Sequence, residues 1–178
     1  IGLMDSAKYT KFFEKHFKYR TFEELSIPLA VAATNLLTGK VQYFNKGELI
    51  QPLIASSALP PYFSPVRIDK GLYSDGGILD NFPIEPIKNL CEVVIGSFIN
   101  PLEPIGEDEL KNSLQLLQRI YNIAMDGNYT RKFKKSDYVF FHNLSNINVL
   151  DTKMLENAFQ YGYEQGIEKI ETIKELVN

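Results

Sequence analysis

The chain has 178 residues and carries 19 Lys and Arg against 22 Asp and Glu, a formal net charge of −3. A domain of this length can bury about 70% of the surface that its unfolded chain exposes, so it needs neither disulfides nor a structural metal. The single Cys91 excludes an intrachain disulfide and fits a reducing compartment. The near-neutral charge argues against a nucleic-acid partner. No apolar run approaches the ~18 residues of a membrane span, so we expect no transmembrane segment.

The first half of the chain alternates between helical and extended patterns. Aromatic residues recur at three- and four-residue spacing over residues 6–17, which predicts an amphipathic helix. The unbroken apolar run at 29–34 predicts a strand covered on both faces, as in a parallel sheet between helices. The other expected elements are a helical turn at 21–25, a turn at 37–40, a strand at 41–44, a helix at 48–59 and two extended pieces between 63 and 73.

The second half predicts two more strands and two long helices. A short helix should end at Leu90, followed by mostly buried strands at 91–99 and 138–141. A helix should start near the acidic residues 107–109 and stop at Asp126, and another should run from a cap at Asp151 to Val177. The inward-facing residues of this last helix are expected to be Leu155, Ala158, Phe159, Gly162, Ile167, Ile170 and Ile173. Alternating strands and helices predict one three-layer α/β/α domain.

Most isolated chemical groups favour structural roles. Cys91 is interpreted as a buried small hydrophobe and His16 as a boundary residue of its helix. The basic run at 131–135 is interpreted as a solvated segment, with a phosphate or anionic lipid contact as the alternative. No nucleotide-binding, zinc or calcium motif is present, so we expect no cofactor and no metal site.

The segment Ser74-Asp75-Gly76-Gly77 is the strongest candidate site. Asp-Gly-Gly can be simply a tight turn. Here an extended segment ends at Asp75, and loops at strand ends in α/β sheets are where ligands bind. A carboxylate in such a loop can accept a nucleophile's proton as a general base. Asp80 is a second nearby carboxylate, interpreted as a capping residue.

The stretch from Thr21 to Ile87 resembles the C-terminal half of patatin-like phospholipases, which are serine acyl hydrolases of lipids. The matching pieces, in order, are Thr21 to Leu25, Ile27-Pro28-Leu29, Ala33-Thr34-Asn35 with Thr38-Gly39, Ala55 to Pro60 with Phe63 and Pro65, Tyr73 to Gly77, and Asn81-Phe82-Pro83. The residues from Val93 to Phe98 also look like the strand that the family places next, which makes 21–98 the best-matching stretch.

The resemblance implies a Ser-Asp dyad in which Asp75 takes the proton of the serine hydroxyl as the serine attacks an ester. Gly76 and Gly77 would keep the approach open, and Asn81 and Pro83 would shape the loop. No histidine is required, in agreement with the poor placement of His16 and His142. The implied substrate is a lipid or other acyl ester, at a membrane surface or in the cytoplasm.

The nucleophile elbow G-x-S-x-G and the glycine-rich oxyanion loop of the family occur nowhere in these residues. Ser56 and Ser57 lack the strand-turn-helix setting that such an elbow requires. Because the chain also begins at Ile1, we expect residues 1–178 to form the C-terminal part of one patatin-like domain, inactive alone and prone to self-association.

Three interpretations remain open at this stage. The preferred one is a lipid acyl hydrolase whose serine lies upstream of these residues. The second is a non-catalytic remnant that binds lipid or a protein partner. The third is another α/β hydrolase that uses Asp75 and Asp80 as its acid and base.

Overall fold

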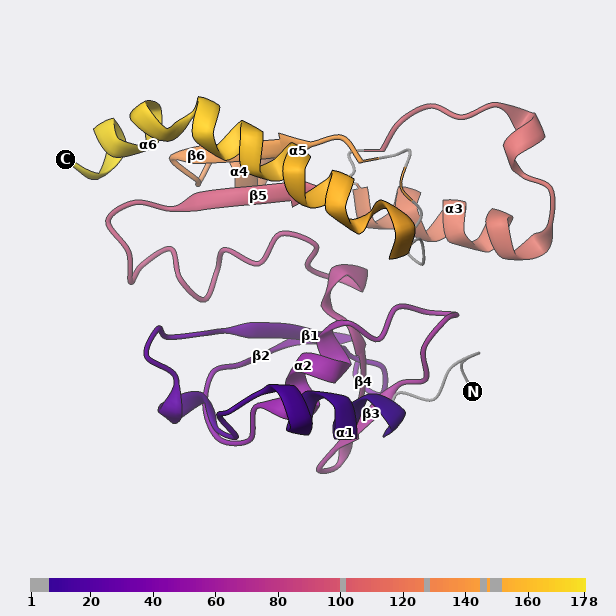
Figure 1. Ribbon diagram of the computed structural model, residues 1–178. Helices are drawn as coiled ribbons and strands as arrows, with labels where there is room; N and C mark the ends of the chain where they lie inside the picture. Colours follow the sequence, from indigo (N-terminus) through magenta and orange to yellow (C-terminus); the bar gives the residue numbers. More distant parts are fainter. Residues whose placement is uncertain (1–6, 100–101, 127–128, 145–146, 148–151) are drawn as a thin grey trace. The chain divides into compact units, whose positions relative to one another are not determined.

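The computed structural model describes residues 7–99, 102–126, 129–144, 147 and 152–178 (Figure 1). They form two compact units, of which one ends at Pro86 and the other begins at Ile87. Each unit has its own sheet, four-stranded in the first and two-stranded in the second. The mixture of helices and sheet confirms the predicted α/β fold class.

The sheet of the first unit is antiparallel throughout. Its strands are β1 (Val31–Asn35), β2 (Lys40–Phe44), β3 (Val66–Ile68) and β4 (Gly71–Asp75), in the order β2-β1-β4-β3. In the central strand β1, Ala33 pairs with Gln42 of β2 on one side and with Asp75 of β4 on the other. The end of β4 therefore lies beside the middle of the most buried strand.

The predicted strand at 29–34 is confirmed as β1, but its expected parallel pairing is wrong. The side chain of Asn35 accepts the N–H groups of Leu37 and Thr38 at 3.0 and 3.3 Å, and Gly39 has a φ of +63°. These features close a tight turn that sends β2 back along β1. The apolar run is buried for a different reason, because α2 and the turn after Asp75 both pack on β1.

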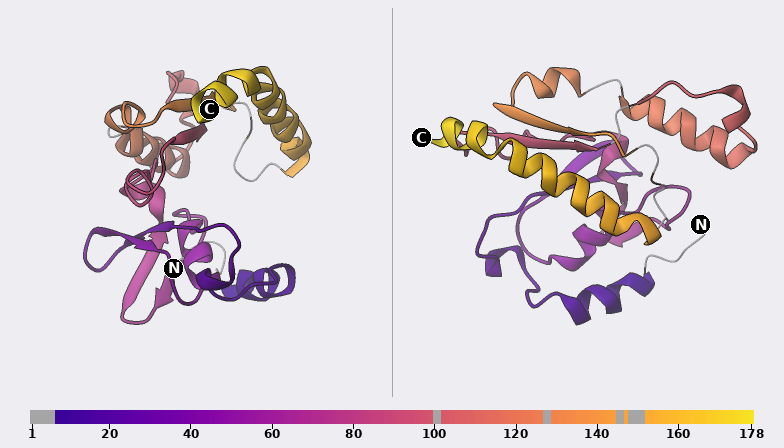
Figure 2. Two further views of the ribbon diagram at one scale, coloured as in Figure 1. Left: turned by 90° about the vertical axis from the view of Figure 1, so that its left-hand side faces the viewer. Right: turned by 45° about the horizontal axis from the view of Figure 1, so that its top comes forward.

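Two helices accompany this sheet. The predicted N-terminal helix is confirmed as α1 (Ala7–His16), and the helix expected at 48–59 is the shorter α2 (Ile50–Ser56). The Glu48 carboxylate accepts the N–H groups of Ile50 and Gln51 at 2.9 and 2.8 Å, which explains the later start. Helix α2 packs on the sheet, and α1 lies alongside α2 in both views of Figure 2.

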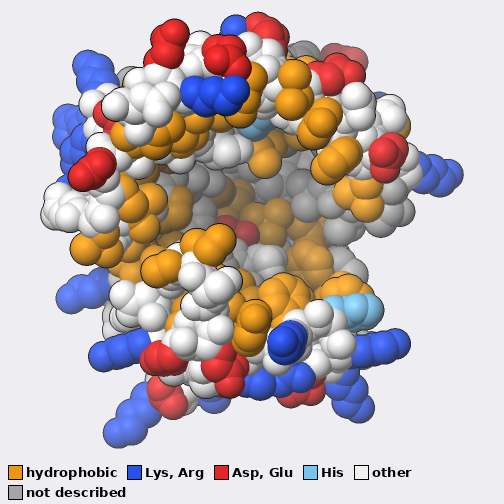
Figure 3. All heavy atoms as spheres, turned by 60° about the vertical axis from the view of Figure 1, so that its left-hand side comes forward, with side chains coloured by type: hydrophobic (Ala, Val, Ile, Leu, Met, Phe, Trp, Pro, Cys, Tyr) orange, Lys and Arg blue, Asp and Glu red, His pale blue; other side chains and the backbone are white. Residues whose placement is uncertain are grey.

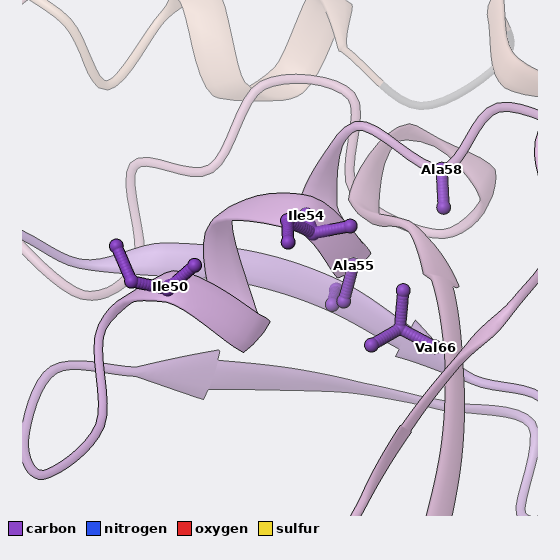
Figure 4. Packing of buried hydrophobic residues seen from close by; sticks show 6 residues of the cluster. Ile50, Ile54, Ala55, Ala58 and Val66 are labelled. Carbon is purple, nitrogen blue, oxygen red and sulfur yellow. The ribbon is translucent and has the colours of Figure 1, made fainter. Parts of the chain in front are cut away.

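The main core of the first unit lies between α2 and the sheet. Its buried members are Ala33, Ile50, Ile54, Ala55, Ala58 and Val66, most of which Figure 4 labels. Small side chains on α2 let the helix approach the strands closely, and Ala55 faces Val66 across this contact (Figure 4). Ala58 lies just beyond the C-terminal end of α2, where the chain turns toward β3.

The second unit contains β5 (Ile95–Ile99) and β6 (Tyr138–His142), paired in parallel. Both strands were predicted, but β5 is not buried on both faces, because Ile95 and Ile99 are exposed while Phe98 is buried. Tyr129 and Phe133 of the segment that includes α4 (Thr130–Phe133) pack their rings on Phe98, at centroid distances of 4.4 and 5.1 Å. One face of this small sheet is thus covered by aromatic side chains.

The helices of the second unit differ from the prediction in length and burial. The acidic segment forms the 3₁₀ turn η3 (Glu107–Glu109), and α3 (Ser113–Asp126) begins only after it. The single helix expected at 151–177 is divided into η4 (Thr152–Met154), α5 (Leu155–Glu168) and α6 (Ile170–Val177). The expected cap Asp151 lies outside the described residues, and the short helix expected before Leu90 is a turn.

The predicted inward face of the last helix is only partly confirmed, because Ala158, Gly162 and Ile173 are half-buried while Leu155, Phe159, Ile167 and Ile170 are exposed. Phe159 of α5 is 65% exposed, and Leu117 of α3 is 59% exposed as well. Hydrophobic side chains at the surface are visible in Figure 3. None of the helices within the described ranges is both long enough and apolar enough to cross a bilayer.

Candidate active site around Asp75

Asp75 is the last residue of β4 and caps the 3₁₀ turn η2 (Gly76–Ile78). One carboxylate oxygen, Oδ1, accepts the N–H of Gly77 at 2.7 Å. Within the described part of the chain, Oδ2 has no hydrogen-bond partner. The Asp75 side chain is thus oriented by one oxygen and keeps the other for a further donor.

The backbone around Asp75 is fixed by the loop that follows α2. The carbonyl of Ala58 accepts the N–H of Asp75 at 3.2 Å and the buried hydroxyl of Ser74 at 2.6 Å. Ala58 itself is 1% exposed. Because a buried hydrogen bond is costly to lose, these contacts hold the end of β4 against the end of α2.

Gly76 is required for the close approach of η2 to β1. A Cβ atom at this position would lie 2.4 Å from the carbonyl oxygen of Ala32 and 2.8 Å from its carbonyl carbon. Both atoms belong to the backbone of the central strand, which cannot move aside easily. The first glycine after Asp75 therefore lets the turn lie directly on the sheet.

The electrostatic setting makes Asp75 a stronger base than an ordinary aspartate. Burial raises its pKa above 3.8, and the hydrogen bond from Gly77 opposes this increase only in part. Among the residues that the structure describes, no positive side chain contributes to the shift. A partly buried carboxylate with a raised pKa and a free oxygen has the properties that a general base requires.

Asp80 has a different environment. It is 5% exposed, its Oδ1 accepts the N–H of Phe82 at 3.3 Å, and its Oδ2 accepts the hydroxyl of Tyr43. Burial and this hydrogen bond raise the pKa of Tyr43, so the phenol stays a donor. Oδ1 of Asp80 thus closes a turn within the loop, and Oδ2 ties the loop to β2. None of the described helices begins at Asp80, so its expected role as a helix cap is wrong.

Asn81 and Pro83 are exposed, whereas their neighbours Phe82 and Ile84 are 5% and 4% exposed. The buried side chains of Phe82 and Ile84 therefore anchor the loop. The role of Asn81 and Pro83 in shaping the loop stays a prediction. Gly77 contributes a backbone N–H to Asp75, a function that needs no side chain.

The remaining predicted candidates lie away from Asp75 or have other partners. The Ser57 hydroxyl donates to the carbonyls of Leu53 and Ile54 at 3.1 and 3.2 Å. Among the described residues, no serine hydroxyl donates to Asp75. Cys91 is exposed, so its expected burial is wrong, because it lies in the turn before β5. His16 is exposed as well.

Sequence reasoning missed two contributors to the site, Ala58 and Tyr43. Ala58 acts through its backbone carbonyl, and no side-chain pattern announces such a role. Tyr43 is separated from Asp80 by 37 positions in the chain, and only the pairing of β1 with β2 brings the tyrosine to this edge.

Comparison with known proteins finds similarity in the first unit. The family described as patatin-like phospholipase matches residues 2–88. An uncharacterized NTE family protein of Mycobacterium tuberculosis is 45% identical over 101 residues, covering 55% of this chain and 28% of that protein. A cGAMP-activated phospholipase of Pseudomonas aeruginosa is 29% identical over 90 residues, covering 44% of this chain and 27% of that protein.

A third relative is the human patatin-like phospholipase domain-containing protein 2, which is 28% identical over 124 residues, or 66% of this chain and 24% of that protein. The chain thus spans about a quarter of the length of the curated relatives that it matches. As the motifs predicted, residues 2–88, slightly less than half of the chain, match the patatin-like phospholipase family, and this stretch carries Asp75.

Proposed function

We propose that this chain supplies the general base of a lipid acyl hydrolase that uses a Ser-Asp dyad, with Asp75 as the base. The observation that carries this proposal is the Asp75 carboxylate at the end of β4, which has a raised pKa and an Oδ2 without a hydrogen-bond partner among the described residues. The match of residues 2–88 to the patatin-like phospholipase family supports the same conclusion. The nucleophilic serine belongs to a segment outside these 178 residues, because the sequence contains no G-x-S-x-G.

In this mechanism Oδ2 of Asp75 takes the proton of the serine hydroxyl while the serine oxygen attacks the ester carbonyl. The proton then passes to the departing alcohol, which leaves an acyl-serine. A water molecule hydrolyses that intermediate, again with Asp75 as the base. The substrate is a lipid or another acyl ester, presented in the cytoplasm or at a membrane surface.

The alternative is a non-catalytic member of the same fold that binds lipid or a protein partner. The exposed apolar faces of α3 and α5 favour it, since such surfaces mark interaction sites. The third interpretation, an acid and base pair of Asp75 and Asp80, is disfavoured by the two protein donors that occupy the Asp80 carboxylate.

The test compares Asp75→Asn with Asp80→Asn in the full-length protein that carries this chain. Asparagine keeps the shape of Asp75 but cannot accept the serine proton, so we expect a loss of about 10²–10⁴-fold in kcat. Asp80→Asn keeps an acceptor oxygen for the loop and should cost far less. Hydrolysis of p-nitrophenyl esters is the measurement, and the 178-residue chain alone should release no product above background.

Three outcomes contradict the proposal. A larger loss from Asp80→Asn would favour the third interpretation. Full activity of Asp75→Asn would exclude Asp75 as the base. Turnover by the chain alone that Asp75→Ala abolishes would mean that a nucleophile lies within these residues.

A further inference from the structure

The outer side of α1 is both basic and apolar. Lys11, Phe12, Lys15 and His16 are all exposed, and their three- and four-residue spacing places them side by side on the helix. Phe12 is 55% exposed, and its ring lies 4.4 Å from that of His16, centroid to centroid. Two lysines therefore frame an aromatic ring at the surface of the protein.

The inner side of α1 is fixed to the first unit. Tyr9 and Phe13 pack against the main core, and the Tyr9 ring meets that of Phe63 edge to face at a centroid distance of 5.5 Å. The amide of Gln51 on α2 donates to the hydroxyl of Thr10 at 3.3 Å. In both views of Figure 2, α1 lies at the edge of the first unit. The helix is thus held by one side, and its outer side faces solvent.

The charge of this part of the chain is opposite to that of the rest. Residues 7–20 contain five lysines and arginines against one acidic residue, a net charge of +4. The whole chain carries −3, so the other residues together carry −7. The guanidinium of Arg20 donates to the carbonyls of Glu14 and Phe17 at 2.6 and 2.5 Å and closes the C-terminal end of the helix. Positive charge gathered on one helix of a negative chain favours an anionic partner for that helix.

We propose that α1 docks on an anionic lipid bilayer, with Lys11 and Lys15 at the headgroups and the ring of Phe12 among the acyl chains. A basic helix that also exposes an aromatic ring fits the boundary between headgroups and hydrocarbon, which accommodates both features. A nucleic acid or an acidic protein surface would satisfy the lysines alone. The inference goes beyond the proposed function, because it assigns a membrane contact to a helix that takes no part in the chemistry at Asp75.

The experiment measures sedimentation of the full-length protein with vesicles of equimolar phosphatidylcholine and phosphatidylglycerol, and with vesicles of phosphatidylcholine alone. We expect binding to the anionic vesicles that weakens as salt is added, and little binding to the neutral ones. Lys11→Gln combined with Lys15→Gln should weaken the binding about 25-fold, since each basic residue near such a surface contributes about 1 kcal/mol. The matched control, Lys40→Gln with Lys70→Gln, removes the same charge from exposed positions at two strand turns and should weaken it far less.

The aromatic ring has a test of its own. Phe12→Ser should weaken binding to the anionic vesicles roughly tenfold, because it removes the side chain that enters the hydrocarbon. Leu37→Ser, which removes a 62% exposed side chain from the turn between β1 and β2, is the control and should leave the binding unchanged.

Three outcomes would overturn the proposal. The first is that the unaltered protein binds no anionic vesicles, and the second is that both lysine pairs cause equal losses. The third is binding that needs the lysines but not Phe12, which indicates a purely electrostatic contact such as a nucleic acid or an acidic protein makes. Sedimentation records no catalysis, so Asp75→Asn should bind like the parent protein. Binding that depends on α1 supports the docking surface even if Asp75→Asn proves fully active.

Discussion

Burial of Asp75 favours its proposed role as a base but lowers the stability of the folded protein. Burial makes its carboxylate a better base, but it also makes the ionised form costly to fold. The one hydrogen bond from Gly77 compensates in part. The residue that the proposed function needs most is therefore one whose charge the fold tolerates poorly, as is common for catalytic groups.

This conflict predicts that Asp75→Asn stabilises the protein at neutral pH. The pKa of Asp75 in the folded state lies above 3.8, the ordinary value that applies to the unfolded chain. Between these two pKa values the folded chain binds more protons than the unfolded chain, so the free energy of unfolding falls as pH rises through this range. The variant lacks this loss. Urea unfolding should show a higher midpoint for Asp75→Asn at pH 7, with a difference that shrinks toward pH 4. A variant less stable than the parent at pH 7 would contradict the assigned cause of the shift.

Gly76 gives a second prediction at the same scale. The Cβ of Gly76→Ala would meet the Ala32 backbone at 2.4 Å, and such overpacking costs about 1–3 kcal/mol. We expect the midpoint of thermal unfolding of the first unit to fall by several degrees. Gly162→Ala is the control, since nothing lies within 4 Å of the Cβ that it adds on α5. That control should be neutral or stabilising.

At the scale of the element, the 3₁₀ turn η1 (Phe22–Glu24) shows how carboxylates fix a local structure. Glu24 accepts the N–H of Arg20 at 2.6 Å and that of Thr21 at 3.2 Å. Glu23 accepts the N–H of Gly47, which follows β2 in the chain, at 2.9 Å. These bonds place the buried Phe22 against Leu49 and Val31, which form a second small core.

The hydrogen bonds of Glu24 predict that the stability of the protein falls at acidic pH. Hydrogen bonds from the backbone of Arg20 and Thr21 lower the pKa of Glu24. The contribution of Glu24 to the free energy of unfolding is therefore complete above pH 4.5 and is lost as pH falls through the lowered pKa. Glu24→Ala should lower the thermal midpoint at pH 7 and have less effect at pH 3.5. Glu14→Ala, an exposed glutamate of α1, is the control and should change neither. Equal losses from both variants would mean that the turn needs no cap.

At the scale of the molecule, the two units differ in how well they bury their apolar residues. The first has a core of buried side chains around α2, whereas the helices of the second leave large hydrophobic side chains at the surface. The first sheet also ends in the edge strands β2 and β3, which offer unpaired backbone groups. Both features are templates for association with another chain.

We therefore expect the isolated chain to self-associate in solution. Light scattering over a dilution series should give an apparent mass that rises with concentration, and a hydrophobic dye should bind. Leu117→Gln combined with Phe159→Gln, which removes two of the exposed side chains, should lower both signals. A monomer that binds no dye at any concentration would contradict this expectation.

The sequence by itself indicated the resemblance to patatin-like phospholipases, the helix α1, the strands and the candidate Asp75, because these depend on local patterns and motifs. It could not determine strand direction, since a buried apolar run is compatible with either pairing and the Asn35 and Gly39 turn decided it. Periodicity marked the apolar face of the last helix, but only the tertiary structure shows that Leu155, Phe159 and Ile167 of α5 remain exposed. The position of Asp75 was likewise decided by residues distant in the sequence, because the Ala58 carbonyl accepts its N–H and the Ala32 backbone lies against Gly76, the next residue.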